Sequence, residues 1–478
     1  MSLNAIVRTG KNASMLLVGS MTRMVASFVF VLYCADKLGV EGFGKYSIAI
    51  HYLELFLSLT ATAAGILLTR DMSRWPRHSN QLMTSAISIT LLMCVFAMIA
   101  MAGVGSVFNY STDTCQALWI ASAALVPASM CAIYEAVFVA RERAEFLTLG
   151  IALESLFRIV LSAWLLYLGY GLLALMWVHF ASRWGLLFAY LLSVKRMGLL
   201  RWSFSKTRSL RFLNRWRVFA AENWMATIYT NLDVIILSTV AGEVATGIYS
   251  AAWKIVRLGS VVAKSYTTAI FPVMSRLYAD SRESFSILYR QTIRIMCAMA
   301  LPAIAVVSVI PGRVIGLFYN SEYADAIVVL QVLIWVLLLD FLNPFLSHVL
   351  FAQGKQHKSM RVAGISLVVN VVATLILVFR FGAMGAAAGT VIGGLVATCF
   401  YLFAAMPKHD VIATFSLAFR VALASIGMGV AIYLFRQSDW FILIGIGILS
   451  YVPLLFAVRA IRPEDVRMFK KTFLIKAT

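Results

Sequence analysis

Charged side chains are scarce in this sequence: Asp, Glu, Lys and Arg together make up 13% of its 478 residues. A soluble globular protein carries about twice that fraction. At the same time, 61% of the residues are hydrophobic and the mean hydropathy is +0.86. This combination excludes a soluble or disordered chain, and it predicts an integral membrane protein that crosses the bilayer many times.

Cysteine is also rare, and the motifs of common catalytic sites are absent. The six cysteines are scattered and form no C-x-x-C pair, so neither a disulfide framework nor a zinc site is indicated. There is no Walker A motif, no H-E-x-x-H and no cluster of metal ligands. The sequence therefore predicts no cofactor, no metal and no enzyme.

Apolar segments of membrane-spanning length fill most of the chain. None shows the ten-residue alternation of a membrane β-barrel, so we expect an all-α fold. The first segment is too long for a signal-peptide core and is expected to be a retained membrane helix. A window of about 20 residues gives fourteen segments, at approximately 12–35, 44–68, 82–105, 115–139, 146–168, 172–194, 217–240, 246–270, 287–310, 324–350, 359–380, 383–406, 414–435 and 439–459.

The basic residues between these segments predict the orientation. If the N-terminus is cytoplasmic, 28 of the 41 Lys and Arg residues lie on the cytoplasmic side, eight of them in the connection 195–217. Only five lie on the other side. The positive-inside rule therefore places both termini in the cytoplasm. The formal charge of +20 then reflects topology and contact with anionic lipid, with no need for nucleic acid.

An internal repeat suggests two lobes. The stretches "EGFGKYSIA" (41–49) and "EVATGIYSAA" (243–252) both carry G-x-Y-S at the start of a helix, and 138–150 resembles 350–364. Segments 1–6 therefore repeat as 7–12 in the same orientation, which is typical of a transporter with a central cavity. The predicted divisions are an N-terminal lobe, a basic cytoplasmic linker, a C-terminal lobe, and two last helices with a tail, over 1–194, 195–217, 218–407 and 408–478.

Basic side chains recur near the middle of predicted membrane segments. Each costs on the order of 3 kcal/mol to insert, so such residues usually line a cavity or pathway. Because arginine binds phosphate oxygens in a bidentate way, this group predicts an anionic cargo. Its members are Arg23, Arg158, Arg183, Lys254 and Arg257.

Acidic residues occur at similar depth, and they leave a second interpretation open. Glu154 and Arg158 are four residues apart and share a helix face, as do His51 with Glu54 and His179 with Arg183. Such pairs could hold helices together, or the acids could carry a coupling ion. The candidate acids are Glu54, Glu154, Asp233 and Asp340.

In this order and spacing, several motifs resemble the Wzx-type flippases of the MOP (multidrug/oligosaccharidyl-lipid/polysaccharide) superfamily. They are "LGVEGFGKYSIA" (38–49), "LLTRDMSR" (67–74), "NLDVIILSTVAGEVATGIYSAAWKI" (231–255), "LFYNSEYADAIVVLQVL" (317–333) and "FAQGKQHKS" (351–359). The plan of six, six and two helices, two MATE-like lobes followed by two C-terminal helices, is similar to theirs.

This resemblance implies ion-coupled alternating access in a bacterial inner membrane. The implied cargo is an undecaprenyl-pyrophosphate-linked oligosaccharide for O-antigen, capsule or exopolysaccharide synthesis. A polysaccharide polymerase and a chain-length regulator are the implied partners. The five mid-membrane cations are then candidates to receive the pyrophosphate.

Two other classes of function stay open. One is a related MOP transporter, either a flippase of another lipid-linked precursor or a MATE-like exporter, which usually stops at twelve helices. The other is a membrane polysaccharide polymerase or ligase. Those enzymes usually carry a large extracytoplasmic loop, which this sequence lacks.

Overall fold

Helices make up the fold of the part of the chain that the structure describes. The computed structural model describes residues 3–198, 203, 206–405 and 408–458, and this part contains no strand. Eleven helices are long and apolar enough to cross a membrane. The predicted all-α, multi-pass membrane fold is confirmed.

Three of these spans contain a glycine whose backbone leaves the helical conformation: Gly39, Gly242 and Gly382. All three have positive φ, which glycine adopts without steric cost. Each lies between two membrane segments that the sequence separates. A single helix label therefore covers two predicted segments at each of these places, and the count of fourteen stays a prediction.

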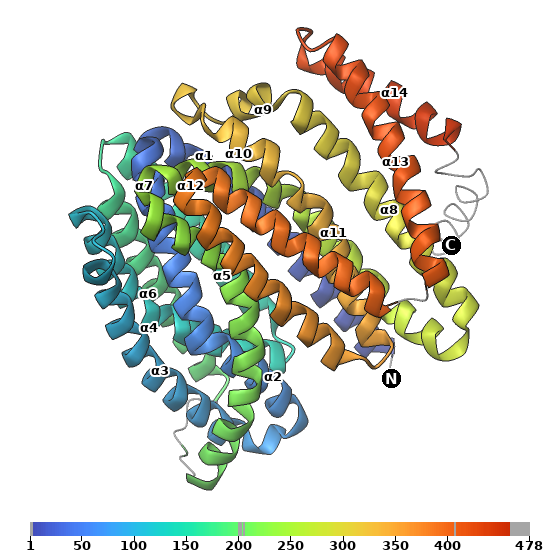
Figure 1. The fold of residues 1–478 in the computed structure, drawn as a ribbon. Coiled ribbons are helices and arrows are strands. Elements are labelled where there is room, and N and C mark those ends of the chain that lie inside the picture. The colour runs from blue at the N-terminus through green and yellow to red at the C-terminus, as the bar shows by residue number, and fades with distance from the viewer. Residues whose placement is uncertain (1–2, 199–202, 204–205, 406–407, 459–478) are drawn as a thin grey trace. The chain divides into compact units, whose positions relative to one another are not determined.

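The chain forms two compact units, residues 1–250 and 251–478. In the first unit, α4 packs against α1, α2, α3 and α6, and Figure 1 shows α3, α4 and α6 as neighbours. Its elements are α1 (Leu3–Leu57), a π-helical turn (Ser58–Thr62), α2 (Ala63–Arg74), a 3₁₀ turn (Pro76–His78), α3 (Ser79–Val107), α4 (Thr112–Ala140), α5 (Ala144–Tyr167), α6 (Leu172–Arg196) and α7 (Lys206–Asp280) as far as residue 250.

The second unit begins within α7. In Figure 1, α13 and α14 lie beside each other, and α13 also packs against α8. The elements are the rest of α7, α8 (Arg282–Val309), α9 (Pro311–Phe318), a 3₁₀ turn (Ser321–Tyr323), α10 (Ala326–Leu333), α11 (Val336–Ala352), α12 (Gln356–Ala405), α13 (Lys408–Leu434) and α14 (Trp440–Ala457).

A stripe of glycines closes the two halves of α12 on each other. A Cβ at Gly385 would meet the backbone of Leu377, and a Cβ at Gly389 would meet Thr374. Gly393 lies in the same way against Asn370. The sequence favours close helix packing for this four-residue repeat, and the structure confirms it.

The start of α7 lies inside the connection that the sequence predicts as a linker, 195–217. Arg215 of α7 donates through Nη1 to Oδ2 of Asp71, at 3.2 Å, and Asp71 is 2% exposed. The Arg70 guanidinium lies over the ring of Phe219, 4.9 Å from its centroid. The beginning of α7 is therefore held against the end of α2. The predicted division into lobes at 194 and 218 stays a prediction.

Candidate functional site

Helix α5 has two contrasting faces. Glu154, Ser155 and Ser162 are buried in the first unit, whereas the apolar side chains between them point outward. This is the reverse of a soluble amphipathic helix, whose polar face is outward. A polar face directed inward, away from lipid, is what a membrane protein uses for a cavity or a buried ion pair.

The buried face of α5 carries an ion pair. Arg158 Nε donates to Glu154 Oε1 at 3.2 Å, and the exposed fractions of the two side chains are 16% and 4%. The i, i+4 spacing predicts this contact, which the structure confirms. The Arg158 guanidinium also lies 5.9 Å from the ring centroid of the buried Phe30 of α1.

Helix α6 adds polar groups on the opposite side of this pair. The Ser182 hydroxyl lies 3.0 Å from Glu154 Oε1 and 2.9 Å from the His179 carbonyl, so its single hydrogen serves one acceptor at a time. His179 is 9% exposed. Among the described residues, His179 Nε2 and Arg183 Nε are buried without a hydrogen-bond partner.

We refer to these groups together as the α5–α6 cluster, made up of Glu154, Arg158, His179, Ser182 and Arg183. The charges of Arg158 and Arg183 both act on the His179 imidazole, which brings the two helices' basic groups into one neighbourhood. Unpartnered buried polar groups are rare in native proteins and usually mark an absent ligand, ion or water. The cluster can therefore accept an anion at its unused donors.

The remaining candidate cations of the described residues lie in the second unit. Lys254 and Arg257 are half-buried on α7. One helical turn beyond Arg257, the Ser260 hydroxyl donates to Asp340 Oδ2 of α11 at 2.6 Å. Asp340 thus accepts a hydrogen bond within the second unit, on the stripe that carries Arg257.

Three further candidates stand apart from the α5–α6 cluster. The side chain of Arg23 lies outside the described residues. Glu54 is exposed, and its predicted neighbour His51 instead bonds through Nδ1 to Asn231 Oδ1 of α7, at 2.8 Å. Asp233 is buried and receives a long hydrogen bond, 3.5 Å, from the Tyr249 hydroxyl.

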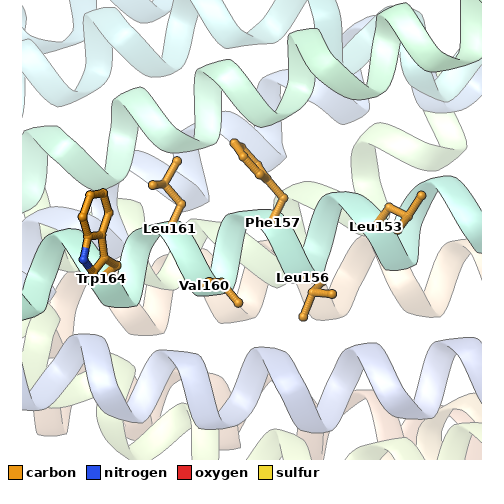
Figure 2. Close-up of a pocket in the computed structure, with 6 residues that line it drawn as sticks. All are labelled: Leu153, Leu156, Phe157, Val160, Leu161 and Trp164. Atoms are coloured by element: carbon orange, nitrogen blue, oxygen red, sulfur yellow. The ribbon is translucent and has the colours of Figure 1, made fainter.

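An apolar hollow follows the outward face of α5. Figure 2 shows the six side chains along this helix that line it: Leu153, Leu156, Phe157, Val160, Leu161 and Trp164. Five of the six are more than half exposed, with Leu161 as the exception. The hollow and the buried Glu154–Arg158 pair therefore occupy different faces of the same two turns of α5.

Sequence reasoning missed a second polar group, at the repeated G-x-Y-S turns. Ser111 donates to Glu243 Oε1 at 2.6 Å from its hydroxyl and 3.3 Å from its backbone N–H, and the Thr114 hydroxyl donates to the same oxygen. Lys45 Nζ lies 2.8 Å from Glu41, 3.4 Å from Asp113 and 3.8 Å from Glu243. The repeat was the signal that could have located this group, because its two copies meet here.

Two family models match the chain. Residues 9–278, more than half of the sequence, match the family described as polysaccharide biosynthesis protein. Residues 219–376 match the MatE family.

The curated relatives are distant. The probable low-salt glycan biosynthesis flippase Agl15 of Haloferax volcanii is 25% identical over 233 residues, 48% of this chain and 47% of that protein. The capsular polysaccharide biosynthesis protein CapF of Staphylococcus aureus is 22% identical, over 38% of this chain and 47% of that protein. The probable flippase AglR of Haloferax volcanii is 22% identical over 78% of each chain. The chain thus spans about half the length of Agl15 and CapF.

Solved structures share the fold over almost the whole chain. The lipid II flippase MurJ, in an inward closed conformation, superposes with a TM-score of 0.77 at 16% identity, covering 96% of this chain and 99% of that one. An inward-facing multidrug resistance MATE family transporter of the MOP superfamily gives a TM-score of 0.67 at 17% identity, covering 84% and 99%. The predicted MATE/MOP-like fold is confirmed.

Proposed function

The chain belongs to the polysaccharide biosynthesis protein family, and from this membership we propose that it is a flippase for a lipid-linked oligosaccharide. Two of its relatives are named flippases and a third is named for capsular polysaccharide biosynthesis. These relatives point to a transporter. The proposed cargo is an oligosaccharide on undecaprenyl pyrophosphate, which moves from the cytoplasmic to the periplasmic face of a bacterial inner membrane.

The α5–α6 cluster is the observation that carries this proposal. A guanidinium at mid-membrane is costly, and Arg158 and Arg183 lie on neighbouring helices with only part of their donors used. Pyrophosphate carries several oxygens that guanidinium binds in charge-assisted pairs. Such donors offset the loss of hydration when the charged head group leaves water.

The apolar hollow supports the other half of the cargo. A polyprenyl chain is a branched hydrocarbon that gains free energy by remaining in an apolar environment. The hollow offers leucine, valine, phenylalanine and tryptophan surface on the outward face of α5. One helix then serves both parts of an amphipathic cargo, with the tail in the hollow and the head group on the buried face.

The wider assignment follows from the same proposal. The other cargo-binding cations are Arg23, Lys254 and Arg257, and the acids that could carry a coupling proton or Na⁺ are Glu54, Glu154, Asp233 and Asp340. Both termini are cytoplasmic in this proposal. The polymerase and the chain-length regulator that use the exported repeat units are the proposed partners.

The test measures lipid-linked repeat units in a strain deleted for the gene, with add-back of wild type and of Arg158→Gln at matched membrane levels. We expect the deletion to trap the glycan on the cytoplasmic face, wild type to restore export and Arg158→Gln to restore much less. Normal export without the protein would refute the flippase. Full rescue by Arg158→Gln would leave the flippase in place and remove Arg158 from the cargo site.

A related MOP transporter with different cargo is the second candidate, because residues 219–376 match the MatE family. Two guanidinium groups with donors to spare disfavour a cationic drug. In the same deletion strain, drug sensitivity with normal glycan export would favour the exporter. Loss of glycan synthesis rather than of its export would favour a polymerase or ligase.

A further inference from the structure

The α5–α6 cluster contains its own competitor for a cargo anion. Glu154 is 4% exposed, and the donors around it are Arg158 Nε, the Ser182 hydroxyl and the Ser155 hydroxyl, at 3.2, 3.0 and 3.4 Å. A carboxylate held in this way resembles a bound anion more than a spare acid. Its counter-charge is the same guanidinium that the cargo would need.

The unused donors lie one helix away. Arg183 Nε and His179 Nε2 are buried, with no partner among the described residues, and they are one turn apart on α6. Because the charges of Arg158 and Arg183 both act on His179, the unused donors face the same neighbourhood as the ion pair. A second anion therefore has donors waiting for it beside the one that is already satisfied.

We propose that Arg183 and His179 form the open half of an anion site, that Arg158 completes it, and that Glu154 is the internal counter-ion which the cargo phosphate displaces. The inference rests on the proposed function. It adds His179 as a binding residue and gives Glu154 a role in setting cargo affinity. The ligand class is a pyrophosphate ester.

Counter-ion exchange fixes the sign of one substitution. A carboxylate that loses its guanidinium in a buried site is destabilised, and this loss is subtracted from the free energy of cargo binding. Replacing Glu154 with glutamine removes the competing charge and retains an oxygen that can accept from Ser182. If Glu154 only positioned Arg158, the same change would weaken binding instead.

Glu135 of α4 provides the matched control. Its charge acts on the Cys131 thiol, as do those of Glu154 and Arg183, so it belongs to the same electrostatic neighbourhood. It receives the Tyr190 hydroxyl at 3.4 Å, and no contact joins it to Arg158. A general gain from removing negative charge would appear in Glu135→Gln as well, whereas release of Arg158 would not.

The experiment uses the full chain in nanodiscs of neutral lipid, with undecaprenyl pyrophosphate as the probe and undecaprenol as its uncharged counterpart. We expect Glu154→Gln to tighten probe binding about threefold or more, and Glu135→Gln to change it less. Arg158→Gln and Arg183→Gln should each weaken it about tenfold, and His179→Leu several-fold. In Glu154→Gln combined with Arg158→Gln, the gain should vanish, because no guanidinium is released.

The outcomes separate this inference from the function on which it rests. Equal binding of the pyrophosphate and the alcohol by wild type would refute the proposed cargo. A preference for the pyrophosphate that Glu154→Gln weakens or leaves unchanged, or that Glu135→Gln raises equally, would refute counter-ion exchange alone. Thermal unfolding checks each variant, and Glu154→Met makes the same test if Glu154→Gln does not fold.

Discussion

Gly44 and Gly247 pack backbone to backbone, although they belong to separate copies of the G-x-Y-S motif. A Cβ at Gly44 would collide with the Glu243 carbonyl oxygen, and a Cβ at Gly247 would collide with the Val40 carbonyl oxygen. The contact is reciprocal, as expected where two copies of one structural repeat meet. The motif is therefore a point of contact between repeats as well as a helix start.

This close approach predicts that Gly44→Ala is destabilising. The added methyl meets a carbonyl of another helix, which cannot rotate away as a side chain can. We expect a loss of about 1–3 kcal/mol in the free energy of unfolding, measured as a lower melting temperature of the detergent-purified protein. Gly103→Ala in α3 is the control, because nothing lies within 4 Å of its new Cβ. Equal melting of both variants would contradict the contact.

Periodicity and composition were enough to predict the membrane helices, the repeat and the glycine stripe of α12, because each depends on a pattern within the chain. Side-chain partners across helices were not predictable in the same way. The spacing of Glu154 and Arg158 correctly predicts a pair, whereas His51, three residues from Glu54, bonds to Asn231 instead. A shared face makes contact possible, but the residue on the opposite helix decides whether it forms.

The donors around Glu243 predict a second stability effect. Glu243→Gln removes the charge that Lys45 faces and weakens the bonds from Ser111 and Thr114, and the Glu243 side chain is only 14% exposed. We expect a loss of about 1–3 kcal/mol. Glu41→Gln removes the other partner of Lys45 at a side chain that is 59% exposed, and it should change stability by less than about 0.5 kcal/mol. Thermal unfolding of both variants decides, and a larger effect at Glu41 would contradict this ranking.

Asp71 predicts how the beginning of α7 is held. Its buried carboxylate accepts from Arg70 at 3.0 Å and from Arg215 at 3.2 Å. Because Asp71→Asn leaves these guanidinium groups without their charged acceptor, we expect α7 to detach more often near Arg215. Limited trypsin digestion in detergent should then cut there several-fold faster than in wild type.

The control for this digestion is Glu145→Gln. Glu145 pairs with Arg143, and the exposed fractions of the two side chains are 45% and 54%, so the substitution should leave cleavage at Arg215 unchanged. Unchanged cleavage in Asp71→Asn would show that the guanidinium stacking on Trp75 and Phe219 is sufficient to hold the helix.

The hollow on α5 predicts a loss of transport without a loss of stability. Val160 lines the hollow and is 58% exposed, so Val160→Trp should fill it with an indole at little cost to the packed interior. If the polyprenyl tail uses this surface, glycan export in the deletion strain should fall several-fold, while the melting temperature stays at that of wild type. Leu149→Trp places the same side chain on the same helix outside the hollow, at a residue that is 60% exposed, and should export normally. Equal export by the two variants would mean that the tail crosses elsewhere, and equal loss would mean that any added bulk on α5 is harmful.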